Sequence, residues 1–288
     1  MNVLLTGATG FLGRHIAAAL VEGGHEVTPA SRRHGVDFTK MIESANWIPH
    51  LEKIDAVINC VGIIGEVGTQ RFEVIHAQAP IALFDACAQA GIRRVIQISA
   101  IGTESAAFSK YHQSKLIADN WLRSLDLDWI ILRPALIYGA DGVSTNVLMR
   151  LARLPLIPIV GDGKQVLQPM YVDDVATAVV RSLSFEEVKK TIDLVGSENI
   201  SYADWMQILR QAQGLKKGLL LRIPYRLAVQ ILRLGCHISP VLHPDNLRML
   251  RAGYLSDVVQ TMDVLGCSPR RVENGLFFSD TQKRRAAS

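Results

Sequence analysis

The sequence has few cysteines and no long apolar segment. Its four cysteines are widely spaced and form no C-x-x-C pair: Cys60, Cys87, Cys236 and Cys267. This spacing supports neither a metal site nor a disulfide framework, so we expect reduced thiols and a cytoplasmic protein. No uncharged apolar run reaches about 18 residues, and a membrane-spanning helix is therefore not expected.

Charge is also scarce, but it is unevenly distributed. Residues 206–288 contain 13 basic and 5 acidic residues (+8), whereas residues 1–205 contain 18 and 22 (−4). The basic end is typical of a solvated face, and it would also suit a protein partner or peripheral contact with a membrane. Its arginines are not interleaved with aromatic residues, so nucleic-acid binding is not expected.

Apolar runs typical of strands alternate with segments of helical periodicity. This alternation predicts an α/β protein with a doubly wound parallel sheet, a Rossmann fold. We expect this domain over residues 1–199, with a small, mostly helical lobe for substrate or partner over 200–288. An irregular excursion at about 140–170 is expected to contribute to that lobe. The expected strands are 3–6, 26–30, 56–59, 94–99 and 129–133, and the expected helices are 12–22, 71–90 and 109–125.

A glycine-rich turn follows the first expected strand. In the segment Thr6–Gly13, Gly7 permits a tight turn, Gly10 allows backbone N–H groups to approach a pyrophosphate, and Gly13 allows close packing of helix and strand. A diphosphate there would lie at a helix N-terminus, which favours negative charge. The expected cofactor contacts of the turn are Gly7, Thr9, Gly10, Phe11, Leu12 and Gly13.

The end of the second strand indicates which dinucleotide is bound. An NAD site usually places an acidic residue there, but this chain has Ser31, Arg32 and Arg33. A hydroxyl and two guanidinium groups suit a 2′-phosphate, so NADP(H) is favoured over NAD(H). The alternative is that both arginines are ordinary solvated residues.

Tyr111 and Lys115 are four residues apart and would share one face of a helix. A neighbouring ammonium group favours the phenolate, so we expect Lys115 to lower the pKa of Tyr111 and allow proton exchange with a substrate oxygen. Ser99, at the end of the preceding strand, would hydrogen-bond the same oxygen.

Together these features resemble the short-chain dehydrogenase/reductase superfamily in its extended or atypical branch. The glycine turn, Ser99, Tyr111 and Lys115 occur in the family's order. The further matching segments are Asn59–Gly62, Arg133–Gly139 and Pro169–Ala176. Asp245–Leu250 and Leu265–Leu276 are similar to the tail of relatives of the NAD(P)H-binding accessory subunit of respiratory complex I.

The resemblance implies a role for each matching residue. Tyr111 would be the acid and base, Lys115 would hold the nicotinamide ribose, and Ser99 would orient the substrate oxygen. The remaining implied cofactor contacts are Asp37 and Phe38 at the adenine, Cys60, Val61 and Gly62 along the cofactor, and the backbone at Pro134 and Ile137 near the nicotinamide. For Cys60 we favour the role of a small buried apolar residue over a redox role.

The chain departs from the family pattern at three points. His76 stands where relatives commonly carry Asn, and we favour a core or cap histidine over a catalytic one. Ala100 follows Ser99 where many relatives have a second hydroxyl, so the catalytic serine position could fall on Ala100. The short interval between Ser99 and Tyr111 disfavours a sugar-nucleotide substrate.

Two functions remain open. The first is an NADP-dependent oxidoreductase acting on an organic carbonyl or alcohol of unknown identity. The second is an NAD(P)H-binding assembly or regulatory protein without turnover, similar to NmrA-like sensors or complex I accessory subunits. The Tyr111–Lys115 pair favours the enzyme.

Overall fold

The structure, a computed structural model, describes residues 1–235 and 243–272. The described residues form two compact units: unit 1 comprises residues 1–134, 172–194 and 257–268, and unit 2 comprises 135–171, 195–235, 243–256 and 269–272. The chain thus first enters unit 2 at Ala135, and the excursion expected at 140–170 belongs to that unit. Residues 236–242 and 273–288 of the expected C-terminal lobe, which include Cys236 and part of the tail resemblance, lie outside the described residues.

Unit 1 is built on a six-stranded sheet in the order β10-β5-β4-β3-β1-β2, with every neighbouring pair parallel. The predicted doubly wound sheet is confirmed. The sixth strand was not predicted, because β10 is an edge strand whose polar and half-exposed residues form no apolar run. The strands are β1 (Asn2–Thr6), β2 (Glu26–Ala30), β3 (Ala56–Asn59), β4 (Arg94–Ile98), β5 (Asp128–Pro134) and β10 (Lys190–Leu194).

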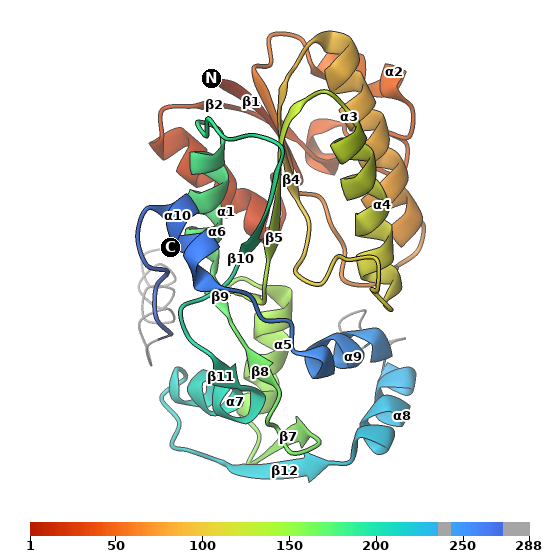
Figure 1. Cartoon of the computed structure of the whole chain (residues 1–288). Coiled ribbons are helices and arrows are strands. Elements are labelled where there is room, and N and C mark those ends of the chain that lie inside the picture. The colour runs from red at the N-terminus through yellow and green to blue at the C-terminus, as the bar shows by residue number, and fades with distance from the viewer. Residues whose placement is uncertain (236–242, 273–288) are drawn as a thin grey trace. The chain divides into compact units, whose positions relative to one another are not determined.

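Helices cover both faces of this sheet (Figure 1). One face carries α1, α6 and α10, and the other carries α2, α3 and α4. The α-helices are α1 (Phe11–Glu22), α2 (Ser44–Trp47), α3 (Ala79–Ala90), α4 (Lys110–Ser124), α6 (Val172–Ser182) and α10 (Val258–Leu265). Short 3-10 turns form η1 (Arg32–His34) and η2 (Ile48–His50), and a π-helical turn forms η3 (Glu73–Gln78).

The helix expected over 71–90 is therefore divided into η3 and α3. Pro80 lies at the start of α3 and has no N–H to donate to the carbonyl of His76, four residues earlier. The backbone is wound as a π-helix just before this proline, and this widened turn contains His76 itself.

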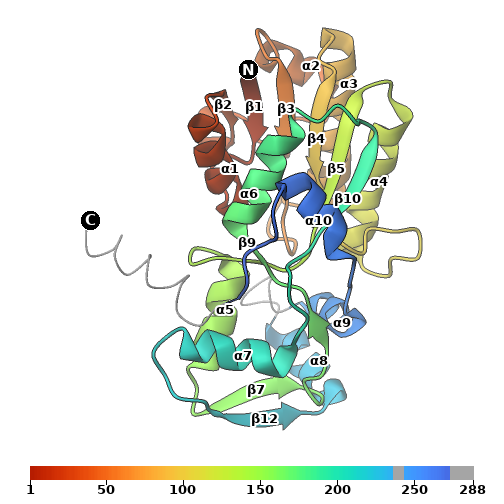
Figure 2. The same cartoon turned by 60° about the vertical axis from the view of Figure 1, so that its left-hand side comes forward.

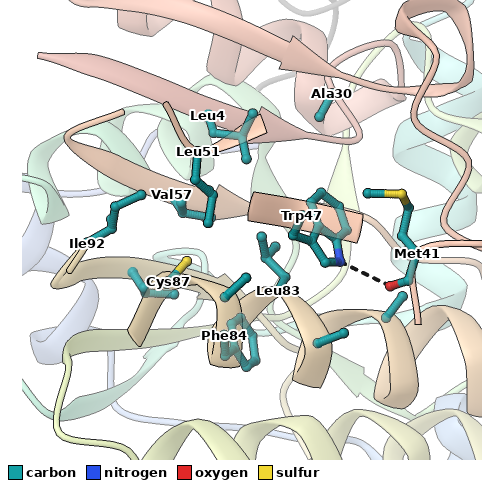
Figure 3. Packing of buried hydrophobic residues seen from close by; sticks show 14 of the residues in the cluster. Leu4, Ala30, Met41, Trp47, Leu51, Val57, Leu83, Phe84, Cys87 and Ile92 are labelled. Atoms are coloured by element: carbon teal, nitrogen blue, oxygen red, sulfur yellow. Dashed lines mark hydrogen bonds between the residues drawn. The ribbon is translucent and has the colours of Figure 1, made fainter. Parts of the chain in front are cut away.

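The core of unit 1 packs between the sheet and the helices α2 and α3 (Figure 3). Trp47 is fully buried, and its indole N–H donates to the carbonyl of Met41 at 3.0 Å. Around it lie aliphatic side chains from strands and helices, among them Leu4, Val57 and Leu83. This packing fixes the strands whose carboxyl ends carry the candidate site.

Unit 2 combines helices with three two-stranded sheets, which pair β7 with β12, β6 with β9 and β8 with β11. Its core surrounds the buried Tyr138 and Trp205, whose rings meet edge to face at 5.2 Å. No helix within residues 1–235 and 243–272 is long and apolar enough to cross a membrane. The elements are β6 (Ile137–Tyr138), α5 (Val143–Ala152), β7 (Leu156–Val160), β8 (Val166–Leu167), β9 (Met170–Tyr171), β11 (Ile200–Ser201), α7 (Tyr202–Gln211), β12 (Leu219–Ile223), α8 (Tyr225–Gly235) and α9 (Pro244–Ala252).

Candidate functional site

The glycine turn connects β1 to α1, which is the structural context that the sequence predicted. Gly7 adopts a φ of 69° and its N–H donates to the carbonyl of Ala30, which ties the turn to β2. A Cβ on Gly13 would lie only 2.1 Å from the carbonyl oxygen of Gly7, so a side chain cannot fit there. Helix α1 begins at Phe11 with no acidic residue in its first turn. This cradle fits the diphosphate of a dinucleotide.

Three arginines lie in the segments around this turn. Arg32 and Arg33, in η1 directly after β2, are exposed and line an open cavity of about 520 Å³ together with Thr9. Arg14, which is not among the predicted cofactor contacts, donates to the Thr9 carbonyl at 3.1 Å. The position of Arg14, immediately after the last glycine of the turn, could have indicated this arginine from the sequence. Ser31, by contrast, is buried, and its hydroxyl shares a hydrogen bond with the His34 ring.

The residues expected at the adenine lie just beyond η1. The carboxylate of Asp37 accepts hydrogen bonds from the backbone N–H and the hydroxyl of Thr39 at 3.1 and 2.9 Å. The Phe38 side chain is buried and packs edge to face on Trp47 at 5.2 Å. The structure therefore uses the Phe38 ring as part of the core.

Tyr111 and Lys115 share a face of α4, as expected. Lys115 is buried, its Nζ lies 5.7 Å from the centre of the Tyr111 ring, and it donates to the carbonyl of Ile98 at 3.0 Å. The expectation that Lys115 lowers the pKa of Tyr111 is wrong in this structure. Burial raises that pKa, and the nearby Asp119 carboxylate raises it further. Tyr111 thus carries its proton at neutral pH.

Ser99 is joined to a buried polar chain. Its hydroxyl donates to Asp119 at 2.5 Å, and the other carboxylate oxygen accepts from the Gln97 amide at 3.4 Å. Gln97 in turn accepts from Asn59 at 2.7 Å, and Asn59 accepts from the Thr6 hydroxyl at 2.7 Å. This series of side-chain hydrogen bonds therefore runs from the glycine turn across β3 and β4 to α4.

Asp119 and Gln97 are not among the site residues predicted from the sequence. A usable signal existed, because Asp119 follows Lys115 by four residues on the same helical face and Gln97 precedes Ser99 by two on the same strand face. Burial raises the pKa of Asp119, an effect that the Ser99 hydroxyl and then Lys115 partly offset.

His76 links the segment after β3 to α4. Its Nε2 accepts from the Ile63 N–H at 3.0 Å, so the ring hydrogen is on Nδ1, which donates to the Ser114 hydroxyl at 3.0 Å. Ser114 then donates to the carbonyl of Tyr111 at 2.9 Å. Burial, and then Lys115, lowers the pKa of His76 well below its usual value. His76 is thus a neutral, buried histidine whose ring contacts the Tyr111 ring edge to face at 5.3 Å.

The segment after β3 lies beside both the glycine turn and α4. A Cβ on Gly7 would lie 3.2 Å from a methyl group of Val61, and one on Gly62 would lie 3.6 Å from the amino group of Lys115. Burial raises the pKa of the Cys60 thiol to about 12, with Lys115 acting in the opposite direction. The Cys60 thiol is therefore protonated at neutral pH.

The remaining predicted contacts fall in different units. Pro134 is the last residue of β5 in unit 1, and its carbonyl accepts from the Ile101 N–H at 3.1 Å. Ile137 is the first residue of β6 in unit 2. Among the described residues, no group of three or more His, Cys, Asp or Glu side chains is arranged to hold a metal ion.

Comparison with known proteins identifies the family. Residues 3–195 match the NAD dependent epimerase/dehydratase family. The chain belongs to this family. The predicted likeness to the extended branch of the short-chain dehydrogenases/reductases is confirmed.

Two relatives with different names are similar to this chain. The chain is 28% identical over 236 residues to a ceramide reductase of Caulobacter vibrioides, covering 77% of this chain and 73% of the relative. It is also 28% identical over 208 residues to the mitochondrial NADH dehydrogenase [ubiquinone] 1 alpha subcomplex subunit 9 of Mus musculus, covering 66% of this chain and 55% of that subunit. The chain thus spans only about half of the subunit's length.

Solved structures share the family fold. MoeE5 in complex with UDP-glucose and NAD matches with a TM-score of 0.74 at 22% identity, covering 100% of both chains. UDP-N-acetylglucosamine 4-epimerase from Bacillus cereus matches with a TM-score of 0.73 at 18% identity, covering 100% of this chain and 97% of the epimerase. At this identity the likeness supports the fold.

Proposed function

We propose that this chain is an NADP(H)-dependent oxidoreductase that reduces an organic carbonyl to an alcohol. The observation that carries the proposal is the convergence of Tyr111, Lys115 and Gly62 beside the glycine turn of the same unit. Fold alone would not separate an enzyme from a cofactor-binding protein.

In this proposal a reduced nicotinamide cofactor, when bound, would supply the hydride for reduction of the carbonyl carbon. The Tyr111 hydroxyl donates its proton to the carbonyl oxygen, which completes the alcohol. Burial raises the pKa of Tyr111, so at neutral pH the hydroxyl carries the proton that reduction requires. The relative named as a ceramide reductase supports the same direction.

The remaining side chains of the site would bind the cofactor or hold the backbone segments around it in place. Lys115 would hold the nicotinamide ribose, and His76 holds the segment around Ile63 against α4 through its two hydrogen bonds. Arg32 and Arg33, with Arg14 close to the turn, would bind the 2′-phosphate that distinguishes NADP(H) from NAD(H).

Titration with NADPH and NADH, followed by nicotinamide fluorescence, tests the cofactor. We expect tighter binding of NADPH, and a loss of affinity of about tenfold or more in Arg32→Ala/Arg33→Ala, because a hydrogen bond to a charged group contributes about 1.5–3 kcal/mol. Arg71→Ala, which removes an exposed arginine on another segment, is the control. A preference for NADH that both the Arg32→Ala/Arg33→Ala variant and the control retain would contradict the assignment of NADP(H) as the cofactor.

Tyr111→Phe tests the chemistry. With a ketone or aldehyde found by screening for NADPH oxidation, kcat should fall about 10²–10⁴-fold, the usual contribution of a general acid. NADPH affinity should change little, because the hydroxyl acts on the substrate. Unchanged turnover in Tyr111→Phe would show that this residue is not the acid.

A second function, cofactor binding without turnover, is supported by the likeness to the NADH dehydrogenase subunit and by the hydrogen of Ser99, which is directed to Asp119. In that case the protein binds NADPH with the same arginine dependence but oxidises none of it with any carbonyl compound tested. Tyr111→Phe would then leave every measured property unchanged.

A further inference from the structure

One face of the sheet formed by β7 and β12 is apolar and exposed. The strands are parallel and pair Leu156 with Leu219. Because side chains alternate along a strand, one face carries every second residue. That face, here called the apolar sheet face, consists of Leu156, Pro158, Val160, Leu219, Leu221 and Ile223.

The two faces of this sheet have different surroundings. On the opposite face Ile157 and Ile159 are fully buried in the unit 2 core, which α7 covers (Figure 2). On the apolar sheet face Leu219 is 72% exposed, Leu156 49% and Leu221 47%. Exposed leucines grouped on adjacent strands are unusual in a protein surface that contacts only water.

A second exposed apolar ridge follows in the chain. Helix α8 begins after Pro224, and its residues Leu227 and Ile231 lie one turn apart and are 48% and 50% exposed. Ala228 on the same helix is buried. The chain therefore presents apolar side chains to solvent on two consecutive elements.

The charges of the segment that contains β12 and α8 have one sign. Residues 205–244 contain no Asp or Glu and six basic residues: Arg210, Lys216, Lys217, Arg222, Arg226 and Arg233. Arg210 is bound to the carbonyls of Lys216, Ala152 and Leu154. Lys216 and Lys217, just before β12, and Arg226, on α8, are exposed and are here called the basic rim. Arg222 alternates with the exposed leucines and belongs to the opposite face of the sheet.

We propose that the apolar sheet face and its basic rim bind the surface of a membrane that contains anionic lipids. The leucines would enter the interface between headgroups and acyl chains, and the side chains of the basic rim would contact the lipid phosphates and carboxylates. A second copy of this chain fits the same face less well. A two-fold contact would place two basic rims against each other with no acidic residue of the segment to neutralise them.

Sedimentation with lipid vesicles tests the proposal. We expect the protein to bind vesicles of phosphatidylcholine with phosphatidylserine, to bind phosphatidylcholine alone weakly, and to dissociate as salt is raised. Lys216→Gln/Lys217→Gln should lower the partition constant about 25-fold, because each basic residue contributes about fivefold. Lys40→Gln/Lys164→Gln, at exposed lysines elsewhere, should leave it unchanged.

Leu219→Ser/Leu221→Ser separates membrane insertion from simple charge attraction. This variant keeps every charge and should lower the partition constant at least about tenfold, as expected for two leucines leaving an apolar phase. Val21→Ser, at a valine that is 65% exposed on α1, is the matched control, and unchanged thermal unfolding would show intact folds. The proposal is overturned if anionic vesicles are not bound, or if the leucine variant binds as the wild type does. It is also overturned if the protein is a dimer that the leucine variant dissociates.

Discussion

Ser99 donates its hydroxyl hydrogen to Asp119 at 2.5 Å, and both side chains are buried. In this arrangement the Ser99 oxygen can accept a hydrogen bond but has no hydrogen left for a substrate carbonyl. A protonated Asp119 would reverse the bond, because its O–H could then donate to Ser99 and free the serine hydrogen. The raised pKa of Asp119 brings this state closer to neutral pH.

Acidification should therefore reveal Asp119 in the stability of the protein. Because its pKa is raised, the folded state takes up the proton at higher pH than the unfolded state, whose pKa is about 3.9. The contribution of Asp119 to the free energy of unfolding thus increases as the pH falls from the folded pKa toward 3.9. A tenfold difference in proton affinity between the folded and unfolded states corresponds to about 1.4 kcal/mol.

Asp119→Asn removes this titration and keeps the shape of the side chain. We expect the difference in unfolding free energy between wild type and Asp119→Asn, measured with urea from pH 4 to 8, to grow in favour of the wild type at low pH. The exposed Glu22→Gln provides the control. Parallel curves for wild type and Asp119→Asn would contradict the raised pKa.

The sequence predicted the parts of unit 1 that local patterns determine. Five strands, the glycine turn and the Tyr111–Lys115 face of α4 depend on apolar runs, glycines and helical spacing. The polar chain through Asn59, Gln97 and Asp119 was missed, because it joins residues that are up to 60 positions apart and only the parallel register brings them together. The short strands of unit 2 were missed for a related reason, since two-residue pairings have no periodicity.

His76 should contribute to both stability and cofactor binding. His76→Ala would leave the half-buried Ile63 N–H without its acceptor, and we expect a loss of about 2–4 kcal/mol in unfolding free energy from the lost bonds and the cavity. His76→Asn restores an acceptor and should recover part of this stability. Urea unfolding measures the effect on stability, and NADPH titration measures the effect on cofactor binding. An Ala variant as stable as the wild type would show that the Ile63 contact contributes nothing.

Two glycines should respond differently to alanine. Gly13→Ala places a methyl group 2.1 Å from the Gly7 carbonyl, so the turn must deform, at a cost of about 3 kcal/mol or more. A Cβ on Gly62 would lie 3.6 Å from both His76 Nε2 and Lys115 Nζ, an ordinary contact, so stability should change by less than about 0.5 kcal/mol.

NADPH affinity separates the two variants further. Gly62→Ala should weaken binding in a protein that remains fully folded, because the methyl group occupies space beside the Lys115 amino group where the cofactor is proposed to lie. Unchanged affinity in Gly62→Ala, with normal thermal unfolding, would place the nicotinamide ribose elsewhere.

The titration of His112 should change the free energy of unfolding in acid in the opposite direction to that of Asp119. Burial lowers the pKa of His112 to about 4, an effect partly offset by a hydrogen bond to the backbone of Ile101. The unfolded chain binds a proton near pH 6.5 while the folded state remains neutral, so stability is lost as the pH falls from 6.5 toward 4. The loss amounts to about 3 kcal/mol at about pH 4.

The two titrations change the unfolding free energy in opposite directions. The pH dependence of wild-type stability alone would therefore underestimate both contributions. His112→Gln removes the histidine titration and should flatten the loss between pH 6.5 and 4, so that the variant gains on the wild type in acid. The double variant with Asp119→Asn should follow the sum of the two single changes only if the groups titrate independently. Both lie on α4 and both respond to Lys115, so a departure from that sum would show that one titration changes the charge or the position of Lys115 at the other. A fully additive cycle would show that Lys115 stays charged and in place throughout.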